Sequence, residues 1–283
     1  ADKNFYQRKL HGLAWYATYV EALKSISSWA YELNVGKKFG ALERLILILG
    51  FNEYLHQLRG GILMSQNEFI RPDELDINKS FFKIFSSNNI MLFLEIDEIE
   101  ILKNQFINLV KEHPSIPTIG NDGLNEDQTI IREQFFKFSR DKIAPNAHSW
   151  HLEDKLIPLE IIDQLAQMGV FGLTIPEMYG GVGLDKISMC VVSEELSRGY
   201  IGVGSLATRT DIASELILCG GSDAQKEKWL PRIANGEIIP TAVFTEPNVG
   251  SDLGSLQTRA KLVGDHYQVT GNKTWITHAA RAD

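Results

Sequence analysis

Apolar residues recur every three or four positions along the first third of the chain, which is the period of an amphipathic helix. One such series covers residues 10–34, a second lies between residues 40 and 60, and a third lies between residues 90 and 110. Successive amphipathic helices bury their apolar faces against one another. The pattern therefore predicts a helical extension over residues 1–112.

The periodicity stops at residues 113–125, where the sequence HPSIPTIGNDGLN combines two prolines, two glycines and polar turn formers. Such a composition is typical of a linker between domains. The helical period returns in residues 126–237, which we predict to be a second, separate helical domain.

Prolines and caps set the expected helix ends in this second domain. A helix that includes Phe135 should end before Pro145, and a short helix should lie between Pro158 and Gly169. Ser222 and Gln225 form the pattern of a capping box, which opens a helix expected to end before Pro231.

From residue 238 onward the pattern changes from helical to β-prone. Short runs of β-branched and aromatic residues alternate with turn pairs such as Gly264-Asp265 and Gly271-Asn272. These runs predict strands, and residues 238–283 are expected to begin a β domain. The predicted strands cover residues 238–244, 259–263, 266–270 and 273–277.

Composition and charge exclude some classes of function for this chain. The 283 residues are 44% hydrophobic and carry a net charge of -8. No run of Lys and Arg marks a surface for phosphates, so we expect no nucleic-acid partner. The longest apolar run, residues 45–51, is too short to span a bilayer, so we expect no membrane insertion.

The two cysteines, Cys190 and Cys219, lie in apolar stretches with a helical pattern, where buried free thiols are expected. Free thiols favour a reducing, cytoplasmic location. The histidines show no metal-ligand spacing with the cysteines or with one another, and we predict no metal site.

Residues 241–255 (TAVFTEPNVGSDLGS) are the most informative segment. A β-prone run leads into a turn of Pro, Asn and Gly, followed by Ser251 and Asp252. Backbone N–H groups and hydroxyls exposed at such a turn can bind an anionic or carbonyl-rich ligand. An ordinary tight turn in a β domain would have the same pattern, so this segment alone leaves both interpretations open.

Five motifs in order resemble the acyl-CoA dehydrogenase family. The turn TEPNVGSD is followed at the family's spacing by KTWIT at residues 273–277, and three upstream motifs match the family's helical domain. Val249 and the bulky Val243-Phe244 pair depart from the family's common residues. The three upstream motifs are MGVFGLTIPEMYGGVG, EELSR and QKEKWLPRIANG.

The resemblance implies an α+β protein. Its expected parts are the helical N-terminal extension, the acyl-CoA dehydrogenase α-helical domain and the start of the middle β-barrel domain. The family's C-terminal helical bundle is missing from these residues. Because the family's glutamate base lies in that bundle, we name no catalytic residue here. Family members associate through the bundle, which implies a homodimer or homotetramer.

The resemblance also implies FAD as cofactor and α,β-dehydrogenation of an acyl-CoA thioester, with electron-transfer flavoprotein as electron acceptor. Preorganised donors stabilise the charge that a reduced flavin gains. Ser251 also matches a position near the CoA thioester arm of the substrate. The positions that match FAD contacts are Phe244, Thr245, Gly250, Ser251, Trp275, Ile276 and Thr277.

Two segments of the extension, residues 11–25 and 53–72, resemble the branch of the family that oxidises methylsuccinyl-CoA to mesaconyl-CoA in the ethylmalonyl-CoA pathway. A substrate with a free carboxylate needs a cationic partner. Arg209 is the candidate for that role. The alternative is that Arg209 pairs with Asp211 or with another surface carboxylate.

Other functions within and outside the family stay open. Another short-chain or glutaryl-type dehydrogenase or an acyl-CoA oxidase would have similar flavin motifs, since one fold serves several reactions. A protein of another class, which binds CoA or a partner without catalysis, would use the helical extension for docking.

Overall fold

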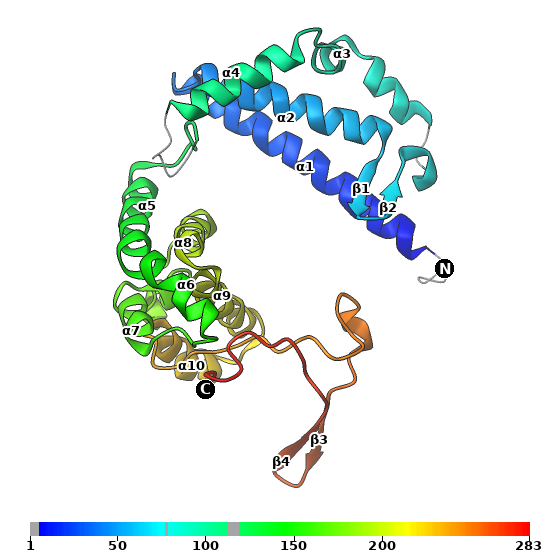
Figure 1. Cartoon of the computed structure of the whole chain (residues 1–283). Coiled ribbons are helices and arrows are strands. Elements are labelled where there is room, and N and C mark those ends of the chain that lie inside the picture. The colour runs from blue at the N-terminus through cyan, green and yellow to red at the C-terminus, as the bar shows by residue number, and fades with distance from the viewer. Residues whose placement is uncertain (1–5, 77–78, 113–118) are drawn as a thin grey trace. The chain divides into compact units, whose positions relative to one another are not determined.

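The computed structural model describes residues 6–76, 79–112 and 119–283, and two compact units divide the chain at residues 124 and 125 (Figure 1). The first unit contains helices α1, α2, α3 and α4 and one β-hairpin. Its elements are α1 (Gln7–Val35), α2 (Ala41–Gly60), β1 (Ile62–Ser65), β2 (Glu68–Ile70), α3 (Asn88–Leu94) and α4 (Ile99–Lys111), with 3-10 helices at Pro72–Leu75 and Lys79–Ser86.

Helices α1 and α2 lie side by side and share an apolar core with the hairpin (Figure 1). Gly12 allows a close approach, since a Cβ atom there would lie 2.4 Å from Cγ1 of Ile70 on β2. The helices predicted over residues 10–34 and 40–60 are confirmed, and the third predicted helix is divided between α3 and α4. The hairpin was missed because each of its strands has only three or four residues.

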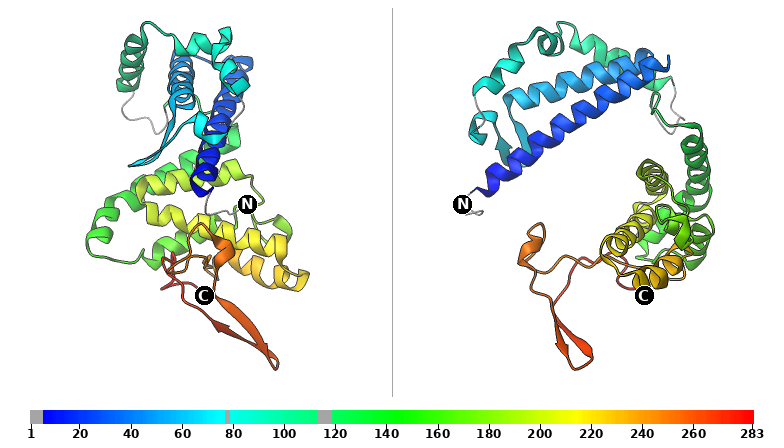
Figure 2. Two further views of the ribbon diagram at one scale, coloured as in Figure 1. Left: turned by 90° about the vertical axis from the view of Figure 1, so that its right-hand side faces the viewer. Right: turned by 180° about the vertical axis from the view of Figure 1, so that it is seen from behind.

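The second unit contains the helices α5 to α10, followed by a hairpin that extends from them (Figure 2). Its elements are α5 (Glu126–Phe138), a π-helical segment (Ser139–Ile143), α6 (Ala144–Leu152), α7 (Leu159–Gln167), α8 (Lys186–Gly199), α9 (Ile201–Gly220), α10 (Asp223–Ala234), β3 (Arg259–Val263) and β4 (His266–Thr270). Short 3-10 helices lie at Val170–Gly172, Glu177–Tyr179 and Leu253–Ser255.

The core of the second unit lies between α5, α7, α8 and α9. Leu165, Val192, Leu196 and Val203 are each fully buried within one apolar cluster. Burial of these side chains removes apolar surface from water, which stabilises the packing of the helices.

Two helix ends differ from the prediction because proline is tolerated in both places. Pro145 lies in the first turn of α6, where its missing N–H would have no helical partner, and the π-helical segment joins α5 to α6. Pro231 lies inside α10, which continues to Ala234 because Leu230, Ile233 and Ala234 are buried. The predicted capping box at the start of α10 is confirmed.

The predicted strands at residues 238–244 and 273–277 are wrong. The described residues form a hairpin of β3 and β4 here, with no further strand alongside it, and no barrel is present in this part of the chain (Figure 1). Trp275 has a φ of 57°, which a β-strand does not allow. A β-prone run forms a strand only where a neighbouring strand accepts its hydrogen bonds.

The predicted burial of the cysteines is also wrong. Cys190 on α8 and Cys219 on α9 are exposed, because each lies on a helix face that points away from the apolar cluster. None of the helices in the described ranges combines the length and the hydropathy needed to cross a membrane.

Leu196 provides a test of the core. Leu196→Ala should lower the free energy of unfolding of this unit by about 2–5 kcal/mol, because the substitution leaves a cavity among packed side chains. Ile187 lies on the same helix with 55% of its surface exposed, so Ile187→Ala is the matched control and should cost less than about 1 kcal/mol. Urea unfolding would measure both, and equal losses would contradict this assignment of the core.

Candidate functional site

The carboxylate of Glu246 joins three segments of the second unit. Glu246 is 5% exposed, and it accepts hydrogen bonds from the backbone N–H groups of Gln257 and Thr258 at 2.8 and 2.9 Å. The ammonium of Lys273 donates to the same carboxylate and to the carbonyl of Phe244, both at 2.9 Å. Charge-assisted bonds of this kind are stronger than neutral ones, so the three segments are held firmly together.

A backbone bond brings the two predicted FAD segments side by side. The N–H of Thr274 donates to the carbonyl of Thr245 at 3.1 Å. Phe244 and Thr245 therefore lie beside the chain that leads to Trp275 and Thr277. Neither segment forms a strand, so their side chains are positioned by these few bonds.

Several of these side chains are exposed. The side chain of Trp275 leaves 89% of its surface open, and Phe244 leaves 38%. Gly250 and Ser251 are exposed at the turn, and a Cβ atom on Gly250 would meet nothing within 4 Å. Exposed aromatic rings near an exposed turn fit a planar heteroaromatic ligand with polar edges.

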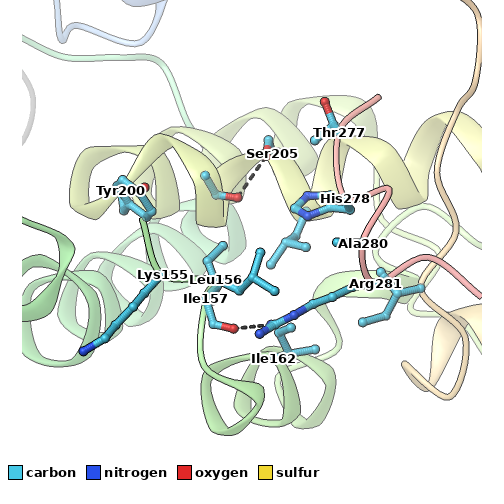
Figure 3. Close-up of a pocket in the computed structure, with 13 residues that line it drawn as sticks. Lys155, Leu156, Ile157, Ile162, Tyr200, Ser205, Thr277, His278, Ala280 and Arg281 are labelled. Carbon is cyan, nitrogen blue, oxygen red and sulfur yellow. Dashed lines mark hydrogen bonds between the residues drawn. The ribbon is translucent and has the colours of Figure 1, made fainter. Parts of the chain in front are cut away.

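A cavity of 220 Å3 lies next to the second of these segments (Figure 3). Thr277, His278 and Arg281 line it from the C-terminal segment, while Tyr200 and Ser205 line it from the start of α9. The remaining lining residues are mostly apolar: Lys155, Leu156, Ile157, Ile162, Gly202, Leu206, Ile239 and Ala280. A small apolar cavity with a few polar groups is suited to a short acyl group.

The surroundings of the His278 ring disfavour its charged form. Burial lowers the pKa of His278, and the positive charges of Arg209 and Arg281 lower it further. Its Nε2 atom is buried without a hydrogen-bond partner among the described residues. The spacing of the histidines in the sequence gave no signal for this half-buried ring beside the cavity.

Arg209 does not pair with Asp211. The Asp211 carboxylate accepts instead from Lys186 at 2.9 Å and from the hydroxyl of Thr174. Nε of Arg209 is buried and has no hydrogen-bond partner in the part of the chain that the structure describes. A buried donor without a partner is costly, and an anionic ligand would satisfy it.

Glu194 and Glu195 serve helix packing. Glu195 is fully buried, with its carboxylate 2.9 Å from Nε of Arg198 and 3.5 Å from Nε of Arg132. Glu194 is half exposed and lies 3.1 Å from the guanidinium of Arg132. These pairs connect α5 with α8. Within the described ranges, no three His, Cys, Asp or Glu side chains gather as metal ligands would.

The sequence interpretation missed three residues of this region. The sequence motifs assigned no role to Glu246, Lys273 or Arg281. The partners of their side chains are 11 to 124 positions away along the chain, since Glu246 bonds Gln257 and the guanidinium of Arg281 bonds the carbonyl of Ile157. Local patterns contain no signal for contacts at such separations.

Comparison with known proteins shows a family match in the second unit. Residues 125–237 match the family described as acyl-CoA dehydrogenase, N-terminal domain, and residues 241–283 match acyl-CoA dehydrogenase, middle domain. Together, the two matched ranges cover nearly all of the second unit.

Individual relatives extend the comparison. The chain is 54% identical to (2S)-methylsuccinyl-CoA dehydrogenase of Cereibacter sphaeroides over 96% of its own length and 49% of that protein. It is 39% identical to mitochondrial isovaleryl-CoA dehydrogenase of Bos taurus, over 57% of this chain and 38% of that protein. The crystal structure of glutaryl-CoA dehydrogenase from Mycobacterium smegmatis matches with a TM-score of 0.54 and 33% identity, over 57% of this chain and 42% of that one.

The relatives differ in how much of the chain they match. The isovaleryl-CoA and glutaryl-CoA relatives match a little over half of the chain, whereas the Cereibacter sphaeroides relative matches nearly all of it. The chain spans about half the length, or less, of these relatives. On the two domain matches and their order, the chain belongs to the acyl-CoA dehydrogenase family.

Proposed function

We propose that the protein catalyses FAD-dependent α,β-dehydrogenation of a short acyl-CoA thioester, converting (2S)-methylsuccinyl-CoA to mesaconyl-CoA in the ethylmalonyl-CoA pathway. The observation that carries the proposal is the 54% identity to the Cereibacter sphaeroides protein of that name, which extends over 96% of the chain. This similarity includes the helical first unit, whereas the similarity to the isovaleryl-CoA dehydrogenase covers 57% of the chain.

The exposed groups around Glu246 fit FAD as the cofactor. The open backbone at Gly250 and Ser251 fits a pyrophosphate, and the exposed ring of Trp275 offers a flat apolar surface. In this proposal Phe244 and Thr245 bind the pyrimidine edge of FAD, and the segment of Trp275, Ile276 and Thr277 lies beside its flavin ring. The cofactor supplies the acceptor for the hydride that leaves the substrate.

Arg209 is proposed to bind the free carboxylate of the substrate. Its buried, unpartnered Nε and its position beside His278 support this role, since His278 lines the cavity next to Thr277. Ser251 is proposed to contact the CoA thioester arm. We assign no catalytic base to these residues, because the carboxylates of Glu195 and Glu246 are both buried against cationic partners.

Electron-transfer flavoprotein is the proposed electron acceptor, and a homodimer or homotetramer is the proposed assembly. Both follow from family membership. Neither depends on a particular residue of this chain, so they can be tested separately from the assignment of the cofactor and the substrate.

Flavin bleaching tests the reaction. The complete native protein, purified with its flavin and kept anaerobic, should lose its long-wavelength flavin absorption when methylsuccinyl-CoA is added. Butyryl-CoA and glutaryl-CoA should leave the band unchanged, because neither presents both the α-methyl branch and the nearby carboxylate.

Each other outcome of this titration contradicts a different part of the proposal. Bleaching by butyryl-CoA would retain dehydrogenation and reject the carboxylate-binding pocket. If air is admitted after the titration, rapid reaction of the reduced protein with oxygen would indicate an acyl-CoA oxidase instead. A colourless protein that binds no FAD would reject the catalytic role and favour a non-catalytic CoA- or partner-binding protein.

Arg209→Leu tests the carboxylate partner. The substitution should raise the KM for methylsuccinyl-CoA about tenfold to a hundredfold, because a charge-assisted bond to the substrate is lost, while the FAD content stays unchanged. Arg232→Leu is the control, since Arg232 lies on α10 and pairs with the exposed Glu237. Steady-state kinetics would measure both variants, and an unchanged KM in Arg209→Leu would remove this residue from the substrate site.

A further inference from the structure

Glu246 and Lys273 are the only described ion pair in residues 238–283 with a buried carboxylate, and they lie where three loop segments meet. The side chain of Glu246 is 5% exposed and that of Lys273 is 21% exposed. The segments come from residues 244–249, 257–258 and 273–274, and β3 and β4 lie between the last two.

These loop segments have few other ways to hold their relative positions. Both faces of the β3–β4 hairpin are exposed, so the hairpin contributes no core at this place. Neither residues 244–245 nor residues 273–277 belong to a strand. Their arrangement therefore depends on individual hydrogen bonds. Four of these end on the side chains of Glu246 or Lys273. Two more join the same segments, from the N–H of Thr274 to the carbonyl of Thr245 and from the hydroxyl of Thr241 to the carbonyl of Thr277.

One end of each proposed FAD segment is held directly by this pair. The Lys273 ammonium holds the carbonyl of Phe244, and Lys273 comes two positions before Trp275. The backbone of Glu246 closes the turn through reciprocal bonds with Val249 at 3.0 Å, and Gly250 and Ser251 follow at once. Glu246 therefore contacts the turn through its backbone and, through its carboxylate and Lys273, the segment that leads to Trp275.

We infer that Glu246 and Lys273 are a positioning pair, which fixes the turn at residues 247–251 and the segment at residues 275–277 in the mutual arrangement that binds FAD. This inference rests on the proposed function and adds two residues to it. Neither side chain needs to touch the cofactor, since both act by holding the backbone whose groups are offered to it.

The charge on Glu246 suits this role. The pKa of Glu246 falls to about 2 because Thr258, the backbone N–H of Gln257 and the ammonium of Lys273 stabilise the charged form. The folded-state pKa lies below the unfolded value, so the stabilisation is fully present above the ordinary pKa of 4.5 and is lost as the pH falls toward 2. The pair stays intact throughout the neutral range.

Glu246→Gln in the complete native protein tests the inference. A glutamine keeps the size of the side chain, but its amide NH2 cannot accept a hydrogen bond and would face a backbone N–H or the Lys273 ammonium. We expect the dissociation constant for FAD, measured by fluorescence titration of the deflavinated protein, to rise about tenfold or more. The visible spectrum of flavin that remains bound should lose resolved structure, because the ring is held less uniformly.

Glu195→Gln is the matched control. Glu195 is also a buried glutamate with cationic partners, but it connects helices and has no contact with residues 238–283 among its described bonds. This variant should lower the unfolding temperature and leave both the FAD affinity of the folded protein and its flavin spectrum unchanged. An equal loss of FAD affinity in the two variants would show a general effect of stability and would overturn the inference.

Lys273→Met provides a second variant that keeps both backbone bonds of Glu246. It should also weaken FAD binding, and the double variant Glu246→Gln/Lys273→Met should lose less than the sum of the two single losses, because the residues act as one unit. Unchanged FAD affinity in folded Glu246→Gln or in Lys273→Met would overturn the positioning role while the proposed function stands. Absence of FAD binding by the unmodified protein would overturn both.

Discussion

A carboxylate that is withdrawn from water must be given partners, and the second unit is organised around two such groups. Glu195 and Glu246 have little or no exposed surface. The desolvation of each charge is offset only if cations and N–H donors surround it. At Glu195 these donors come from α5 and α8, which fixes the packing of two helices. At Glu246 they come from three loops, which fixes the arrangement of the proposed FAD-binding segments.

The helical part of the fold was predictable because its signals are local. A period of three to four apolar residues identified α1 and α2, and the Ser222 capping box identified the start of α10. The errors occurred where a distant contact decides the local structure. The helix α10 passes through Pro231 because its last turn is buried, and residues 273–277 are not a strand because no strand lies beside them in the described chain.

In the candidate site, too, the sequence revealed what local motifs mark and missed what distant contacts decide. The motifs TEPNVGSD and KTWIT marked two segments that the structure places side by side, through the bond between Thr274 and Thr245. The motifs did not reveal what holds the segments together, because Glu246, Lys273 and Arg281 bond residues far away in the sequence. Arg209 could be singled out as a cation, but only the structure shows that Asp211 is already bound to Lys186.

The support for the proposed substrate comes from both units of the chain. The groups that fit FAD, the small cavity and Arg209 all lie in the second unit, which the acyl-CoA dehydrogenase family shares. The first unit has its own apolar core of α1, α2 and the β1–β2 hairpin, and the comparisons with the isovaleryl-CoA and glutaryl-CoA relatives cover a little over half of the chain. A match that includes this unit therefore narrows the choice among relatives, whereas the proposed binding of a substrate carboxylate would depend on cationic groups near the cavity. These two lines of evidence are independent, since one rests on an extra domain and the other on the electrostatics of a pocket.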